Sequence, residues 1–105
     1  MRIAIFGACG AGGYFGARLA QAGEDVIFIA RGEHLDAIRE HGLRIDSIQG
    51  DFIVSPAQAT NDPEKVGAVD MVLLGVKAWQ VPMVSQAIFP LVGPQTVIVP
   101  VQNWV

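Results

Sequence analysis

The chain has 105 residues, of which 51% are hydrophobic and 16% charged, and its formal net charge is −3. This length suits a single domain, and the composition excludes a disordered segment, a membrane-spanning segment and, for want of a lysine–arginine cluster, a nucleic-acid surface. A lone cysteine, Cys9, allows no internal disulfide, and no signal-peptide pattern precedes the first apolar run, so we expect a cytoplasmic location.

The first forty residues alternate between strand and helix patterns. Residues 2–6 form a short apolar, β-branched run that ends at a glycine, which predicts a buried parallel strand. Apolar residues spaced by three and four predict a helix over 12–22, and a second continuous apolar run predicts a strand over 26–30. A further helix is expected over 33–41. Each predicted helix is followed by a glycine at which it should stop.

The middle of the chain predicts shorter elements. Two extended pieces, 43–48 and 52–54, flank the turn sequence 49–51 and predict a hairpin. Residues 61–64 combine a capping residue, a proline and an acid, which is typical of a helix start. Gly67 should keep that helix short.

The last part of the chain returns to the alternation of apolar strand and helix. We expect a buried strand over 71–74, a helix over 82–89 closed before Pro90, a turn at 93–94 and a strand over 96–101. The whole pattern predicts an α/β fold with a doubly wound, mostly parallel sheet and helices on both faces. Because residues 1–105 end directly after a strand, with no closing helix, we interpret them as one domain of a longer, truncated protein.

The turn between the first strand and the first helix carries the first functional hypothesis. In a G-x-G-x-x-G turn, the glycines permit the tight turn, give a pyrophosphate room beside the backbone and let the helix pack close to the strand. The free N–H groups of the helix then face the phosphates. Such a turn, placed between a strand and a helix, predicts a Rossmann-type fold that binds NAD or NADP. Its residues here are Gly7, Ala8, Cys9, Gly10, Ala11 and Gly12.

One position departs from this pattern. Gly7 and Gly12 match the first and third glycines, but Cys9 occupies the middle position and the glycine stands at Gly10. We favour the interpretation in which Gly10 makes the room for the pyrophosphate. Other hypotheses stay open: Cys9 crowds the pyrophosphate, Cys9 is a thiol activated by the helix N-terminus, or the turn binds no ligand.

The residues after the second strand bear on the choice of nucleotide. An acid near the end of this strand binds the ribose 2′-hydroxyl of NAD, whereas arginine accommodates the 2′-phosphate of NADP. Arg31 directly follows the predicted strand, and its planar guanidinium suits a phosphate. Glu33 is the competing acid, but acids are common in the first turn of a helix for dipole reasons alone. We favour NADP over NAD; Arg31 as a solvated surface residue stays open.

Four segments are more specific than the glycine turn, and their order and spacing can be compared with known families. The segments are Gly13-Tyr14-Phe15-Gly16-Ala17-Arg18-Leu19, Ile29-Ala30-Arg31-Gly32, Val76-Lys77-Ala78-Trp79 and Val101-Gln102-Asn103. They resemble the N-terminal, NADP-binding domain of the 2-dehydropantoate (ketopantoate) reductase family, and the resemblance covers essentially the whole chain.

The resemblance implies a role for each matching residue. Arg31 would meet the adenosine 2′-phosphate of NADPH, and Lys77 and Asn103 would line the pocket for the cofactor, with Asn103 also touching the ketoacid substrate. Lys77 as a solvated strand-end lysine and Asn103 as a turn residue are the structural alternatives. The family usually continues with glycine after the asparagine, whereas this chain has Trp104, which puts that stretch in doubt.

The resemblance also implies the reaction, in which hydride passes from NADPH to the keto carbon of ketopantoate and gives pantoate for pantothenate and coenzyme A. In the family, a lysine and a glutamate that serve this step come from a helical C-terminal domain. This chain therefore contains no catalytic residue, and we expect it alone to bind nucleotide but to catalyse poorly or not at all. The absent domain should leave an apolar surface that favours self-association, so a homo-oligomer stays open.

Two other functions remain as alternatives. One is a stand-alone module that senses NAD(P) without chemistry, and the other is a different β-hydroxyacid-type dehydrogenase that shares this first domain. A metal site is not expected, because His34 and His41 stand two helical turns, about 10 Å, apart on one predicted helix.

Overall fold

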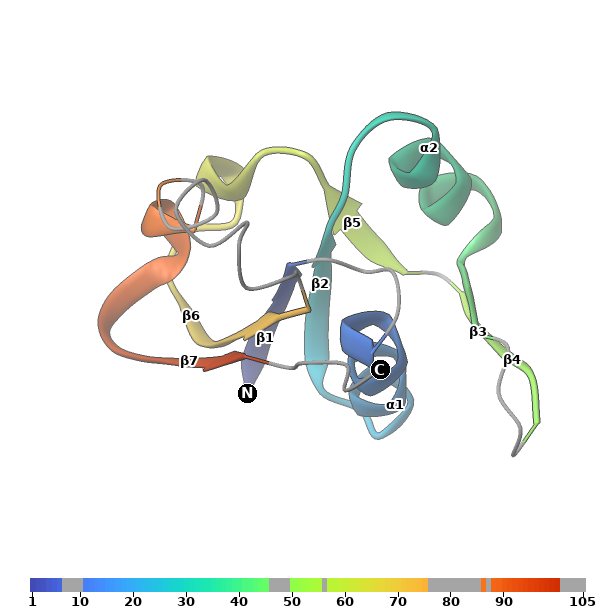
Figure 1. Ribbon diagram of the computed structural model, residues 1–105, viewed down its shortest axis with the longest axis horizontal. Coiled ribbons are helices and arrows are strands. Elements are labelled where there is room, and N and C mark those ends of the chain that lie inside the picture. The colour runs from blue at the N-terminus through green and yellow to red at the C-terminus, as the bar shows by residue number, and fades with distance from the viewer. Residues whose placement is uncertain (7–10, 46–49, 56, 76–85, 87, 101–105) are drawn as a thin grey trace.

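The computed structural model describes residues 1–6, 11–45, 50–55, 57–75, 86 and 88–100. They form a five-stranded sheet in the order β5-β2-β1-β6-β7, whose neighbours are all parallel, and a separate antiparallel pair β3–β4 (Figure 1). The predicted α/β fold with a doubly wound parallel sheet is confirmed. The elements are β1 (Arg2–Phe6), α1 (Ala11–Gln21), β2 (Asp25–Ile29), α2 (Gly32–His41), β3 (Leu43–Ile45), β4 (Phe52–Val54), β5 (Gln58–Thr60), η1 (Pro63–Lys65), β6 (Val69–Leu74), η3 (Phe89–Leu91) and β7 (Val92–Pro100).

The first strand–helix–strand–helix unit agrees with the sequence pattern to within one residue at each end. Helix α2 ends as expected, because Gly42 has φ 85° and its N–H donates to the carbonyl of Ile38 at 2.9 Å. The hairpin is present as β3 and β4, although its turn residues 46–49 lie outside the described residues. None of the helices in the described part of the chain is long and apolar enough to cross a membrane.

Four points of the sequence-based prediction need correction. The sequence pattern missed β5, a three-residue strand that pairs with β2 at the edge of the sheet. The helix start at 61–64 is real, but η1 is a single 3₁₀ turn, capped by the Asp62 carboxylate, which accepts from the Glu64 N–H at 3.1 Å. Residues 82–85 and 87 of the last predicted helix lie outside the described residues, and Phe89 begins η3, which runs through Pro90 instead of ending before it.

The fourth correction concerns the turn predicted at 93–94, which lies within β7 instead of before it. The pairing of β6 with β7 shifts register between Val69↔Val92 and Met71↔Val97, because β7 contains more residues than β6 between these two pairs. The Thr96 hydroxyl spans the irregularity, because it donates to the Val69 carbonyl at 2.6 Å and accepts from the Gly93 N–H at 2.8 Å. A proline is tolerated there because β7 is an edge strand of the sheet.

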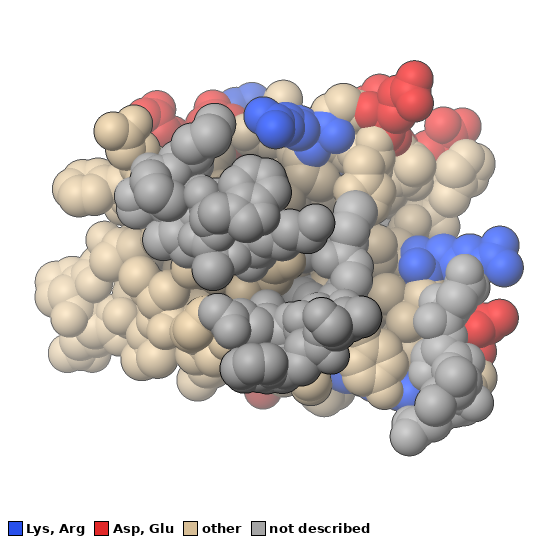
Figure 2. Space-filling model, in the orientation of Figure 1, with Lys and Arg blue, Asp and Glu red and all other residues tan. Residues whose placement is uncertain are grey.

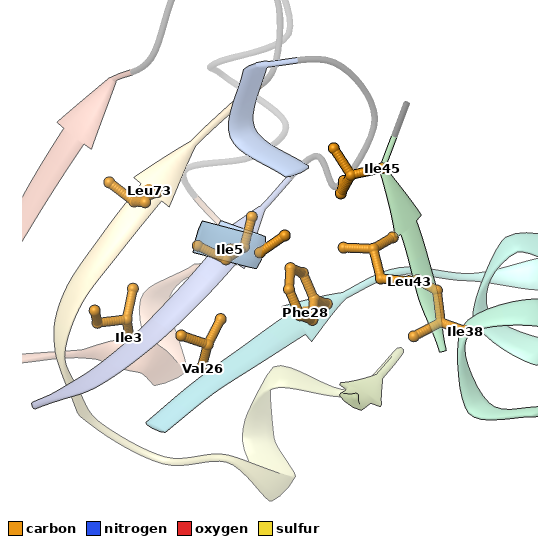
Figure 3. Packing of buried hydrophobic residues seen from close by; sticks show 9 residues of the cluster. Ile3, Ile5, Val26, Phe28, Ile38, Leu43, Ile45 and Leu73 are labelled. Carbon is orange, nitrogen blue, oxygen red and sulfur yellow. The ribbon is translucent and has the colours of Figure 1, made fainter. Parts of the chain in front are cut away.

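Both faces of the central strands are buried, which explains their continuous apolar sequences. On one face, α1, α2 and the hairpin cover a core in which Ile5, Phe28 and Leu43 come from three strands and lie side by side (Figure 3). On the other face, Ile88 and Leu91 cover the alternate residues of the same strands. The second face is thus covered, among the described residues, by the chain around η1 and η3 and not by a long helix.

The hairpin is attached to α1 by a cation–π contact. The Arg18 guanidinium lies over the Phe52 ring, 4.5 Å from its centroid, and its Nε donates to the Tyr14 hydroxyl at 3.3 Å. Such contacts contribute about 0.5–1 kcal/mol at exposed sites. The arginine in the 13–19 segment therefore has a structural role.

A polar network ties the amino ends of the strands together. The Arg2 N–H donates to the Asp70 carboxylate at 2.7 Å, and the Arg2 side chain forms an ion pair with Asp25 at 3.6 Å. Gln58 of β5 donates to the same Asp25 at 2.6 Å. The terminal ammonium lies 3.0 Å from the Glu24 carboxylate, which raises the pKa of that ammonium. These contacts join four strands, β1, β2, β5 and β6, at the amino edge of the sheet.

Candidate cofactor-binding site

The candidate site lies at the carboxyl edge of the sheet, where the chain changes direction. From β1 the chain proceeds outward to β2 and β5, and it then returns to the other side of β1 to form β6 and β7. Phe6 pairs with Leu74 at the ends of β1 and β6, and the Gly75 N–H donates to the Phe6 carbonyl at 2.7 Å. Ligands of open α/β sheets bind at such a switch point, outside the carboxyl ends of the strands.

Helix α1 approaches this edge closely because of one glycine. A Cβ on Gly16 would lie 2.7 Å from Ile5 Cγ1 and 2.9 Å from Phe28 Cε1, so any side chain would collide with the core. The helix starts at Ala11, with only residues 7–10 between it and the end of β1. The sequence predicts close packing at Gly12, whose side-chain surroundings lie outside the described residues; within them, Gly16 allows the close approach.

Arg31 is the sequence-predicted site residue that the structure describes with its surroundings. It follows β2 by two residues, is exposed, and is the N-cap residue of α2 with an extended backbone (φ −148°, ψ 163°). Among the described residues, its side chain has no hydrogen bond or ion pair, and Glu33 is likewise exposed in the first turn of α2. The guanidinium is therefore free to meet an anion at this edge.

The other predicted site residues are only partly placed. Ala11 and Gly12 form the first residues of α1, with side-chain surroundings outside the described part. Lys77 follows β6 by three residues and Asn103 follows β7 by three residues, so the sequence connects both to the carboxyl edge. Lys77 and Asn103 themselves lie outside the described residues. The same holds for the remaining predicted residues, which are Gly7, Ala8, Cys9 and Gly10.

The structure adds one segment to this edge that the sequence pattern did not find. Because β5 pairs with β2, the residues after Thr60 lie beside those after Ile29, and the Ala30 N–H donates to the Thr60 carbonyl at 3.0 Å. The sequence carries no periodic signal for this segment, because β5 has only three residues, Gln58–Thr60.

The described residues hold no buried acid, base or metal cluster. Within those ranges, no polar or charged side chain is buried and no group of three metal-ligating residues comes together. His41 lies 3.8 Å from the exposed Glu40 carboxylate, which suits a solvated helix end. The described part of this edge is therefore equipped to bind an anionic group and offers no buried proton donor or acceptor.

A parallel sheet with this strand order, a switch point beside its first strand and a closely packed first helix defines a Rossmann-like α/β domain. Residues 3–105 match the family model described as "Ketopantoate reductase PanE/ApbA". The chain belongs to this family.

Individual relatives agree with that assignment. The chain is 42% identical over its whole length to a 2-dehydropantoate 2-reductase of Mesorhizobium japonicum, of which it covers 32%. Among solved structures, it matches 2-dehydropantoate 2-reductase from Geobacter metallireducens over its whole length with a TM-score of 0.91 and 40% identity, covering 35% of that chain. It also matches D-mandelate dehydrogenase in complex with NADH and anilino(oxo)acetate, with a TM-score of 0.85 and 31% identity, covering 34% of that chain. The chain thus spans about a third of the length of these relatives.

Proposed function

We propose that this chain is the NADP-binding domain of a cytoplasmic reductase that converts 2-dehydropantoate to pantoate with NADPH. Family membership supports the reaction, since the relative from Mesorhizobium japonicum bears this activity in its name. The exposed Arg31 at the carboxyl end of β2 supports the phosphate-bearing cofactor and is the observation that carries this part of the proposal.

Different residues of the chain would bind different parts of the cofactor. The turn from Gly7 to Gly12 would receive the pyrophosphate at the start of α1, and Arg31 would pair with the adenosine 2′-phosphate through two parallel hydrogen bonds. Lys77 and Asn103 would orient the nicotinamide and the ketoacid beyond β6 and β7. The cofactor, when bound, supplies the hydride, and the protein supplies position and electrostatics.

NADH is the competing cofactor, because D-mandelate dehydrogenase, a structural relative, is seen with NADH and anilino(oxo)acetate. Glu33, exposed two residues after Arg31, is the residue of this chain that would favour a ribose hydroxyl. The two possibilities differ in one measurable quantity, the ratio of the dissociation constants for NADH and NADPH.

Calorimetric titration of the chain with both nucleotides tests the proposal. We expect tighter binding of NADPH, and in Arg31→Ala a loss of about 10- to 100-fold for NADPH with little change for NADH, because a hydrogen bond to a charged group is removed. Lys65→Ala, which removes a positive charge from the exposed η1 turn, is the control and should keep the preference. Equal affinity of the wild-type chain for both nucleotides would contradict the NADP assignment.

The reaction itself is tested on the parent protein, including the two-thirds of its relatives' length that this chain does not span. Turnover with a panel of 2-ketoacids and NADPH should favour 2-dehydropantoate. Preference for another ketoacid would assign a different β-hydroxyacid-type dehydrogenase, and nucleotide binding without turnover of any of them would favour a sensing module.

A further inference from the structure

The strand that the sequence pattern missed places a polar residue next to the proposed phosphate contact. Strand β5 pairs with β2 in parallel, with Ile29 opposite Thr60, so the carboxyl ends of both strands meet at the same edge. The next residue on β2 is tied down as well, since the Ala30 N–H donates to the Thr60 carbonyl at 3.0 Å. Asn61, the residue after β5, is therefore held beside the segment that leads into Arg31.

The local bonding fixes the backbone around Asn61, and within the described part of the chain its side chain has no partner. The Thr60 hydroxyl accepts from the Asp62 N–H at 3.1 Å, which closes a tight turn around Asn61. Asn61 is exposed, and among the described residues its amide has no hydrogen-bond partner. An asparagine with a fixed backbone and a free amide offers two N–H donors to a ligand at this edge.

The carboxylate of the neighbouring residue, Asp62, already accepts a hydrogen bond. The Asp62 carboxylate accepts from the Glu64 N–H at 3.1 Å and caps η1, so it serves the 3₁₀ turn. The side chains at the ends of β2 and β5 that are free to meet a ligand thus include a cation, Arg31, and an amide, Asn61. Both can donate to a phosphate, whereas only the amide can also accept from a hydroxyl.

We propose that Asn61 is a specificity-determining residue that, together with Arg31, binds the 2′-phosphate of the cofactor's adenosine. This inference rests on the proposed function, because it concerns the same cofactor. Arg31 supplies the charge, and the Asn61 amide supplies a donor from the neighbouring strand. The two contacts come from the carboxyl ends of two neighbouring strands, β2 and β5, and so recognise the phosphate by its position as well as by its charge.

The experiment compares Asn61→Asp with the wild-type chain, using NADPH and NADH as probes. Asn61→Asp replaces the donor by a carboxylate of nearly the same shape, so we expect NADPH affinity to fall about tenfold or more and NADH affinity to stay within about twofold. Asn61→Ala, which removes the donor without adding charge, should give a smaller loss for NADPH, about three- to tenfold. Gln95→Glu adds the same charge to β7, three strands away from β2, and should change neither affinity.

The outcomes separate this inference from the proposed function. A wild-type chain without NADPH preference fails the proposed function, and the inference fails with it. A preference that depends on Arg31 but persists in both Asn61 variants overturns the inference alone. An equal loss for both nucleotides in Asn61→Ala overturns it too, because it assigns Asn61 to the general shape of the edge. Titration with 2′,5′-ADP and 5′-AMP, which carry only the adenosine end, should reproduce the NADPH–NADH difference.

Discussion

Strands β1 and β2 at the centre of the sheet and β7 at its edge each contain an apolar run, but the surroundings of these runs are opposite. β1 and β2 pair without interruption from Arg2↔Asp25 to Phe6↔Ile29, and their middle residues are buried on both faces. On β7, Val97 and Ile98 are 54% and 41% exposed, and because consecutive residues point to opposite faces, both faces of this strand are open. The pairing of β7 with β6 is also irregular.

An apolar run therefore predicts a strand, but it does not predict whether other elements of the fold bury that strand. Figure 2 shows the same contrast on the surface: charged side chains gather along the top and the right of the view, while the lower left, where β7 lies in Figure 1, carries little charge. The centre of the sheet positions the candidate site through tight packing. β7 pairs with β6 along one side, at the edge of the sheet, and exposes apolar side chains.

The largest expected effect comes from filling the space between α1 and the central strands. Helix propensity alone predicts that Gly16→Ala stabilises the protein by about 1 kcal/mol. The contacts of the added Cβ with Ile5 and Phe28 predict the opposite sign, since overpacking a filled core costs about 1–3 kcal/mol or more. We therefore expect lower stability for Gly16→Ala and a larger loss, of about 3 kcal/mol or more, for Gly16→Val. Urea unfolding measures both variants; an alanine variant as stable as wild type would show that the helix can move away.

An intermediate loss of stability is expected from a substitution where β7 joins the sheet. Thr96→Val keeps the shape of the side chain and removes the hydroxyl that joins the Val69 carbonyl to the Gly93 N–H. Leaving those two part-buried backbone groups without their partner should cost about 1–2 kcal/mol. Thr96→Ser retains the hydroxyl and serves as the control. Equal unfolding midpoints for the valine and serine variants would mean that water replaces the hydroxyl at no cost.

The same contrast explains how much could be predicted from the sequence. β1, α1, β2 and α2 followed from apolar periodicity and from the glycines that end the helices, because burial on both faces leaves a continuous apolar run. β5 was missed because three residues are too few for a period to show, and its pairing with β2 comes from tertiary contacts. The turn expected at Gly93 and Pro94 was wrong because an edge strand tolerates both residues once Thr96 bridges the irregularity.

The candidate site was predictable in the same uneven way. Arg31 was predicted because the chemistry of NADP recognition places an arginine directly after the second strand, and the structure places it exposed at that strand end. Asn61 could not be found, since its position beside Arg31 depends on the pairing of β5. The close approach of α1 likewise needed coordinates, because a sequence shows several glycines but not which of them faces Ile5. The cofactor-binding roles of all the predicted site residues stay predictions: Gly7, Ala8, Cys9, Gly10, Ala11, Gly12, Arg31, Lys77 and Asn103.

The smallest effect on stability, and a distinct effect on solution behaviour, is expected at the exposed edge. Ile98→Lys places a charge on a side chain that is already 41% exposed, so stability should change by no more than about 0.5 kcal/mol. A lysine on an edge strand opposes pairing with another chain, so self-association of the 105-residue chain should decrease. Light scattering across a concentration series measures this.

Ile53→Lys is the matched control, since Ile53 is 58% exposed on β4, outside the five-stranded sheet. If the β7 edge drives association, only the Ile98 variant lowers the apparent mass at high concentration. An equal decrease in both variants would attribute association to general hydrophobicity, and then the open edge of β7 would differ from the centre of the sheet in packing alone.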